Sequence, residues 1–160
     1  SPRLWVGSQD DYEQKVRHPR PFGYPHLQWS VLHAAKEPYH RDALKYTTRS
    51  LPPNHKHYLY IRQGDHALSL NLIDAADPKY IHPEVIAAAL SFVTERLHAG
   101  DNVLVHCNQG RSRAPSIALL YLVKAGLLPK EDSIAAFKAL YSPYEPNAGM
   151  REYVRKALES

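Results

Sequence analysis

The sequence has little cysteine and no long hydrophobic run. Cys107 is the only cysteine among 160 residues, which excludes a disulfide within the chain and fits a reducing compartment. No run of about 18 apolar residues occurs, so no transmembrane helix is expected. The first residues also lack the apolar core of a secretory signal. These absences predict a cytoplasmic protein with no membrane span.

The sequence also lacks a strong charge bias. Lys and Arg number 20 against 16 Asp and Glu, a net charge of +4, and the basic residues are scattered. Scattered basic residues disfavour a nucleic-acid partner, whereas a mild positive charge is compatible with phosphorylated substrates and with an ordinary solvated surface. His55, His57 and His66 lack the spacing of metal ligands on one element. We therefore expect neither a metal nor another cofactor.

Length and hydrophobic patterning predict one α/β domain over residues 1–160, acting as a monomer. Apolar or alternating runs predict strands at residues 4–6, 27–34, 57–62, 67–73 and 103–106, with a hairpin turn at residues 63–65. Helical spacing and capping signals predict helices that begin at Ser8 and Pro83, and others at residues 41–46, 114–125, 130–141 and 149–158. The proline-rich residues 18–26 are expected to form a loop. Alternating strands and helices in the second half indicate a central, mostly parallel sheet flanked by helices.

The only cysteine lies in a short segment between the apolar strand at residues 103–106 and the apolar helix at residues 114–125. The segment reads His106-Cys107-Asn108-Gln109-Gly110-Arg111-Ser112-Arg113. A strand–loop–helix order directs backbone N–H groups and a helix N-terminus toward the thiol, where they favour an anion. Arg113 adds a planar guanidinium that can bind two phosphoryl oxygens at once. A lone buried cysteine is usually inert, but this combination predicts a site that holds a phosphate dianion against a nucleophilic sulfur.

At these residues the chain resembles the cysteine-dependent protein phosphatases, whose signature is His-Cys, five residues, then Arg, and more narrowly the compact dual-specificity phosphatases. The resemblance covers residues 58–125 and extends to the strand at residues 4–8. It implies a cysteine phosphatase fold and hydrolysis of phosphotyrosine, phosphoserine and phosphothreonine on proteins through a phosphocysteine at Cys107. It also implies that Arg113 and the amides of residues 108–112 bind phosphate. His106 would hold the loop in place by packing and hydrogen bonding.

The resemblance further implies a general acid on a loop about 30 residues before the cysteine. Two aspartates qualify, Asp74 and Asp77, which precede Cys107 by 33 and 30 residues. Asp74 directly follows the apolar run at residues 70–73, as the acid does in family members, and is favoured. Asp77 precedes a proline and could be an ordinary turn former.

One position departs from the family pattern. Family members usually carry Ser or Thr after the arginine, and their hydroxyl helps the cysteine sulfur to leave; this chain has Ala114. The departure puts the second chemical step in doubt and keeps open a phosphate-binding pseudophosphatase that recognises phosphopeptides. A rhodanese-like sulfurtransferase is a further alternative, disfavoured by the Gly110 and Arg113 spacing and by the acid loop.

The substrate is less well defined by the sequence. The loop contains one extra cation, Arg111, and no pair of lysines, which mildly disfavours highly charged inositol phosphates. We expect the walls of the pocket to come from residues 18–57 and from the segment Tyr141 to Asn147.

Overall fold

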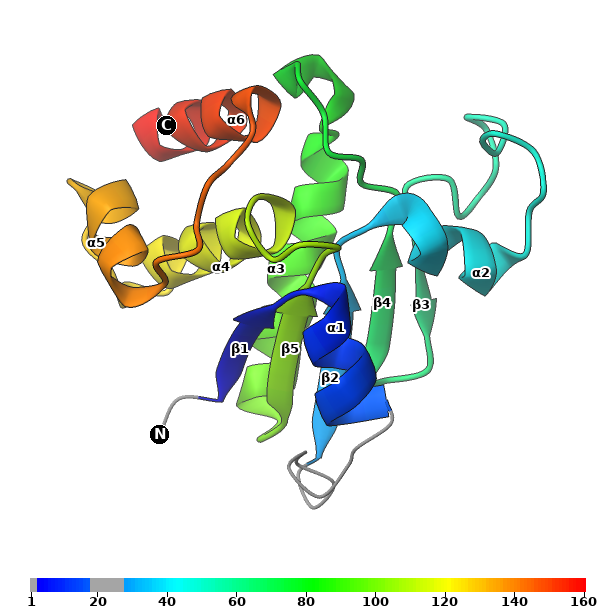
Figure 1. Ribbon diagram of the computed structural model, residues 1–160, viewed down its shortest axis with the longest axis horizontal. Helices are drawn as coiled ribbons and strands as arrows, with labels where there is room; N and C mark the ends of the chain where they lie inside the picture. The colour runs from blue at the N-terminus through cyan, green and yellow to red at the C-terminus, as the bar shows by residue number, and fades with distance from the viewer. Residues whose placement is uncertain (1–2, 18–27) are drawn as a thin grey trace.

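A five-stranded sheet with the order β1-β5-β2-β4-β3 forms the centre of the molecule (Figure 1). The computed structural model describes residues 3–17 and 28–160, and the loop expected at residues 18–26 lies outside them. The strands are β1 (Leu4–Gly7), β2 (Trp29–His33), β3 (Tyr60–Gln63), β4 (Ala67–Leu70) and β5 (Asn102–His106). All neighbouring strands are parallel except β3, which pairs antiparallel with β4 as the predicted hairpin. The predicted fold class is confirmed.

Helices cover both faces of this sheet. The α-helices are α1 (Gln9–Tyr12), α2 (Arg41–Leu44), α3 (Pro83–His98), α4 (Arg113–Lys124), α5 (Ser133–Leu140) and α6 (Ala148–Glu159). Three further helical segments are η1 (Glu13–Arg17), η2 (Lys36–His40) and η3 (Pro78–Tyr80). Figure 1 shows α1 in front of the sheet and α3 behind it. Within the described part of the chain, no helix is both long and apolar enough to cross a membrane.

Local signals in the sequence account for most of these boundaries. Ser8 accepts a hydrogen bond from the backbone of Asp11, and the Asp11 side chain accepts one from the backbone of Ser8, which is the predicted capping arrangement. Pro83 is the first residue of α3. Gly100, with φ 94°, follows the end of this helix. The helix α5 begins three residues later than expected, because Asp132 adopts a left-handed conformation (φ 56°) that interrupts a helix.

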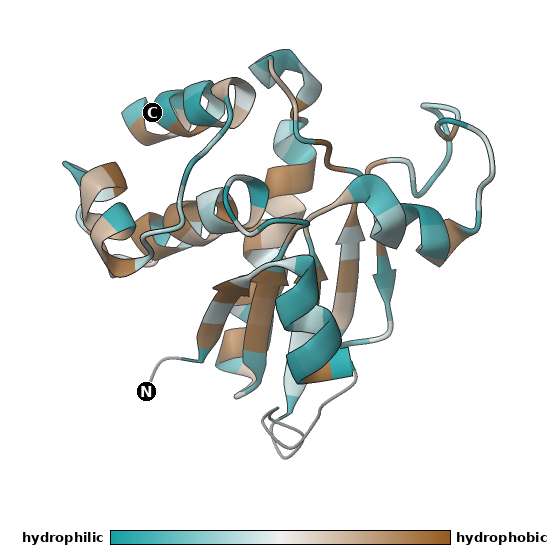
Figure 2. Cartoon of the chain, viewed as in Figure 1, coloured by the Kyte–Doolittle hydropathy of each residue, from teal (hydrophilic) through white to brown (hydrophobic). Residues whose placement is uncertain are grey.

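The hydrophobic core lies between the sheet and the helices α3 and α4. Figure 2 shows hydrophobic residues concentrated in β5 and in the helices behind it, whereas α1 is mainly hydrophilic. Residues 103–106 of β5 and residues 113–121 of α4 are all buried. The segment that joins β5 to α4 is thus fixed at both ends by the core.

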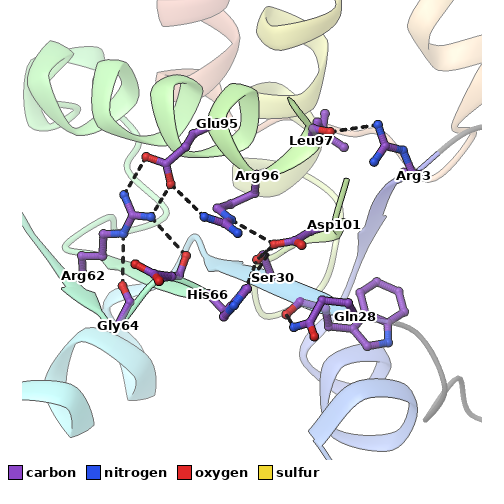
Figure 3. A network of polar contacts seen from close by, with 12 residues as sticks. Arg3, Gln28, Ser30, Arg62, Gly64, His66, Glu95, Arg96, Leu97 and Asp101 are labelled. Carbon is purple, nitrogen blue, oxygen red and sulfur yellow. Dashed lines mark hydrogen bonds and ion pairs between the residues drawn. The ribbon is translucent and has the colours of Figure 1, made fainter. Parts of the chain in front are cut away.

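A network of polar contacts closes the edge of the sheet where β2 and β5 begin (Figure 3). Ser30 and Arg96 each donate to Oδ2 of the buried Asp101, over 2.6 and 2.9 Å. Burial opposes ionisation of Asp101, but these hydrogen bonds hold its pKa below its ordinary value. His66 Nδ1 also lies 3.1 Å from the same oxygen. Ser30 Oγ also lies 2.9 Å from His66 Nδ1, but its hydroxyl donates to the carboxylate, so this serine, histidine and aspartate do not form a nucleophilic triad. They connect the starts of β2 and β4 to the turn before β5, and Arg96 adds the last turns of α3.

Candidate active site

The phosphate-loop candidate, residues 107–112, lies at the carboxyl ends of the parallel strands. It packs on the turn between β1 and α1, where Gln9 N donates to the carbonyl of Asn108 over 3.0 Å. Gly110 has φ 72°, and a Cβ there would lie 2.8 Å from the carbonyl carbon of Gly7. Glycine is therefore required at this position both by its backbone conformation and by the close approach of a second chain segment.

Arg113 turns its guanidinium back toward the loop from the first turn of α4. Its Nη1 donates to the carbonyl of Leu72 over 2.9 Å, and its Nη2 donates to Oδ1 of Asn108 over 2.6 Å. Its Nε is buried and has no hydrogen-bond partner in the described part of the chain. A buried donor without a partner costs about 1–3 kcal/mol, so an oxygen of a bound anion would be stabilised at Nε.

His106 is held between the loop and β2. Its Nδ1 lies 3.1 Å from the carbonyl oxygen of Cys107, and its Nε2 lies 2.7 Å from Nδ1 of His33. A carbonyl oxygen can only accept, so His106 carries its proton on Nδ1 and His33 donates to its Nε2. Burial lowers the pKa of His106 to about 4; burial and the neighbouring His106 lower that of His33 to about 3. Both rings are therefore neutral at pH 7.

Two tyrosines enclose this histidine pair. The ring of Tyr12 stacks on His106 with centroids 4.8 Å apart and 2° between the planes. The ring of Tyr39 stacks on His33 at 4.5 Å and 7°. These contacts bring residues of α1 and η2 beneath the loop. No sequence spacing relates the four residues, so the cluster could not be found from the sequence.

The structure separates the two candidate acids. Asp74 borders the same cavity as Cys107 and Arg113, about 640 Å³ in volume, and its carboxylate accepts a hydrogen bond from Asn147 Nδ2. Asp77 instead borders a different cavity, and its Oδ1 accepts a hydrogen bond from Lys79 N over 2.9 Å at the start of η3. Asp77 thus occupies a turn-forming position, whereas Asp74 lines the cavity that contains Cys107.

The segment between α5 and α6 forms the other wall of the cavity. Tyr141 donates its hydroxyl to the carbonyl of Gly110 over 2.6 Å, and Glu145 N donates to the carbonyl of Arg111 over 2.7 Å. Burial, with the nearby Cys107, raises the pKa of Tyr141 to about 12, so its hydroxyl stays protonated. Glu145, Pro146 and Asn147 border the cavity, which confirms the expected wall for the last three residues of this segment; residues 141–144 do not border it.

The wall expected from residues 18–57 is only partly testable. Residues 18–27 lie outside the described residues, and none of residues 28–57 borders the cavity. For residues 28–57 the expectation is wrong. The carbonyl of Glu37 instead accepts a hydrogen bond from Asn108 Nδ2 over 3.0 Å, so this region supports the loop from the side.

Known proteins share this architecture. No family model matches the chain. A segment of 59 residues, 37% of the chain, is 39% identical to a Slingshot protein phosphatase homologue from Xenopus laevis and covers only 8% of that protein. The structure of DUSP15 superposes with a TM-score of 0.65 at 20% identity, over 99% of this chain and 84% of that one. Human DUSP28 gives 0.64 at 17% identity, over 99% of this chain and 90% of that one.

The chain has the fold of the dual-specificity phosphatases. The resemblance noted in the sequence is therefore confirmed for the fold. A human tyrosine phosphatase-like serine/threonine/tyrosine-interacting protein has the same fold, with a TM-score of 0.62 at 18% identity over 96% of this chain and 89% of that one.

Within this dual-specificity phosphatase fold, the position after the arginine has no hydroxyl. Ala114 is completely buried at the start of α4. In the described part of the chain, neither neighbouring serine has a hydrogen bond to the Cys107 sulfur. Ser112 Oγ accepts a hydrogen bond from Asn147 N over 3.1 Å, and Ser116 Oγ lies 2.9 Å from the hydroxyl of Tyr144. Both side-chain oxygens contact the segment that precedes α6.

Proposed function

We propose that this chain is a phosphatase that hydrolyses phosphomonoesters on proteins through a phosphocysteine intermediate. The observation that carries the proposal is the meeting of Cys107, Arg113 and Asp74 at one cavity. The Nε of Arg113 supports it, because this buried donor has no hydrogen-bond partner among residues 3–17 and 28–160 and suits a phosphoryl oxygen. The proposed unit is a single catalytic domain acting as a monomer without a cofactor.

In the first step, the sulfur of Cys107 attacks phosphorus opposite the leaving oxygen. The sulfur–phosphorus bond forms as the phosphorus–oxygen bond breaks, and Asp74 gives its proton to the departing oxygen. Arg113 and the amides of residues 108–112 hold the equatorial oxygens, whose negative charge persists through the transition state. Phosphotyrosine is the expected substrate, with phosphoserine and phosphothreonine also accepted.

In the second step, water attacks the phosphocysteine and gives a proton to Asp74, and the thiolate of Cys107 leaves. Ala114 offers no hydroxyl to stabilise that leaving sulfur. We therefore expect the phosphocysteine to form readily and to break down slowly, which would appear as a burst of product followed by a slow steady state.

The test is turnover of para-nitrophenyl phosphate by the wild type and by Cys107→Ser. Activity in the wild type and its loss in the variant are expected. A phosphatase activity that survives in Cys107→Ser would overturn the proposal. A panel of phosphopeptides and phospholipids, measured on the same two proteins, then identifies the substrate class.

Ala114 favours a second candidate, a phosphate-binding pseudophosphatase that recognises phosphopeptides without turning them over. The candidate predicts phosphopeptide binding by the wild type without any burst of released product. A stoichiometric burst would exclude it, since the burst requires transfer of the phosphoryl group to Cys107.

A further inference from the structure

Asn147 joins three parts of the cavity that are far apart in the sequence. Its backbone N donates to Ser112 Oγ, in the phosphate loop, over 3.1 Å. Its side-chain Oδ1 accepts from Met150 N over 3.0 Å and so caps α6. Its Nδ2 donates to Oδ1 of Asp74. One residue is thus bonded to the loop that carries the nucleophile and to the carboxylate proposed as acid and base.

The cap of α6 fixes which end of the Asn147 amide faces Asp74. The backbone N–H of Met150 can only donate, so it must meet the amide oxygen. The amide nitrogen then necessarily points to Asp74. Because Nδ2 is a donor, Oδ1 of Asp74 serves as an acceptor, and the proton that Asp74 gives or takes belongs on its other oxygen, Oδ2.

The turn that carries this contact is packed against the core, whereas Asp74 itself is exposed. A Cβ on Gly149 would lie 2.3 Å from the carbonyl oxygen of Ala75, so the first turn of α6 packs directly against the chain that follows Asp74. Met150 is 1% exposed and anchors the same turn in the core. Within the described part of the chain, Asn147 provides the one hydrogen bond to the Asp74 carboxylate. The orientation of an exposed carboxylate therefore depends on a helix whose first turn is anchored in the core by Gly149 and Met150.

We propose that Asn147 is a positioning residue that directs Oδ2 of Asp74 toward the leaving oxygen. The inference rests on the proposed function, since it assumes that Asp74 is the acid. In the first step the proton passes from Oδ2 to the leaving oxygen as the phosphorus–oxygen bond breaks. In the second step Oδ2 accepts a proton from the attacking water. Oδ1 stays bonded to Asn147 Nδ2 in both steps.

The test is Asn147→Ser, which retains an oxygen that can cap α6 but removes the amide nitrogen that donates to Asp74. We measure kcat/KM, which reports the phosphoryl-transfer step, for aryl phosphates with leaving phenols of increasing pKa. General acids contribute about 10²–10⁴-fold, and misplacement by about 1 Å can cost about 10²-fold. We expect little change with para-nitrophenyl phosphate and a loss of about tenfold to a hundredfold with phenyl phosphate. An equal loss for all leaving groups, or none for phenyl phosphate, overturns the inference.

A double-mutant cycle separates this inference from the proposed function. If Asn147 acts through Asp74, Asn147→Ser causes no further loss for phenyl phosphate in an Asp74→Asn background. A further loss contradicts the inference. If Asp74→Asn alone shows no dependence on the leaving group, the acid assigned under the proposed function is wrong instead.

Two further variants distinguish misplacement of Asp74 from a loss of activity caused by impaired folding. Asn102→Ser removes a contact of 3.4 Å to Trp5 at the opposite end of β5, and it should lower kcat/KM equally for all leaving groups or not at all. If Asn147→Ser does not fold, Asn147→Asp also caps α6 but places a carboxylate beside Asp74. The same leaving-group dependence is expected from Asn147→Asp, and its absence in a folded Asn147→Asp contradicts the inference.

Discussion

Nδ1 of His33 lies 2.7 Å from Nε2 of His106, so two buried imidazoles from neighbouring strands share one hydrogen bond beneath the cysteine. The bond requires a lone pair on His106, and both pKa values are depressed by burial. Protonating His106 on Nε2 would break the bond and place two donors against each other. The fold thus holds the residue before Cys107 in one neutral tautomer.

The histidine pair makes stability sensitive to mild acid. The folded pKa values of about 3 and 4 lie below the ordinary value of 6.5, so below pH 6.5 the unfolded chain binds more protons than the folded one. The contribution of the pair to the free energy of unfolding is fully present above pH 6.5. It falls as the pH drops toward 4, by about 1.4 kcal/mol per pH unit for each histidine. Urea unfolding at pH 7, 6 and 5 measures this slope. His33→Asn, which keeps an N–H donor, should show about half of it, and an unchanged slope would contradict the role of the pair.

Ala114→Ser should raise kcat. A hydroxyl at this position can donate to the leaving sulfur of Cys107, and a tenfold gain corresponds to about 1.4 kcal/mol, within the range of one hydrogen bond to a charged group. Stopped-flow measurement of the burst and of the steady state separates the two steps. The matched control is Ala118→Ser, one turn further along α4 and also buried, which should give no gain. A wild type without a burst, or an Ala114→Ser protein without a higher kcat, would contradict the prediction that the missing hydroxyl slows phosphocysteine breakdown.

Asp74→Asn and Asp77→Asn should differ strongly although the residues are three positions apart. Asp74 borders the cavity of Cys107, whereas Asp77 caps η3. We expect Asp74→Asn to lower kcat/KM for phenyl phosphate by about 10²-fold or more and Asp77→Asn to change it little. The opposite ranking of the two variants would move the acid to Asp77.

Gly110→Ala should abolish activity, whereas Gly126→Ala should not. Both glycines have positive φ, 72° and 74°, so both substitutions incur about 1–2 kcal/mol of backbone strain. Only at Gly110 does an added Cβ approach another segment, the carbonyl carbon of Gly7 at 2.8 Å; at Gly126 nothing lies within 4 Å. Thermal unfolding and para-nitrophenyl phosphate turnover measure the two effects. Full activity in Gly110→Ala would show that the loop tolerates displacement from the β1–α1 turn.

The elements that the sequence predicted well are those specified locally. The capping box at Ser8 and Asp11, the hairpin around Gly64 and the opening of α3 at Pro83 each depend on residues within a few positions of one another. The start of α5 at Ser133, three residues later than predicted, could not be expected, because aspartate rarely adopts the left-handed conformation that Asp132 has.

The sequence by itself determined that a thiol would follow a buried strand and that an arginine would begin the next helix, because apolar patterning alone places Cys107 and Arg113 between two core elements. Only the tertiary structure decided what surrounds them. His33, Tyr12 and Tyr39 pack around His106 from three other elements, and α6 brings Asn147 to Asp74 rather than to Asp77. Contacts of this kind depend on how the helices pack on the sheet, and no spacing along the chain encodes them.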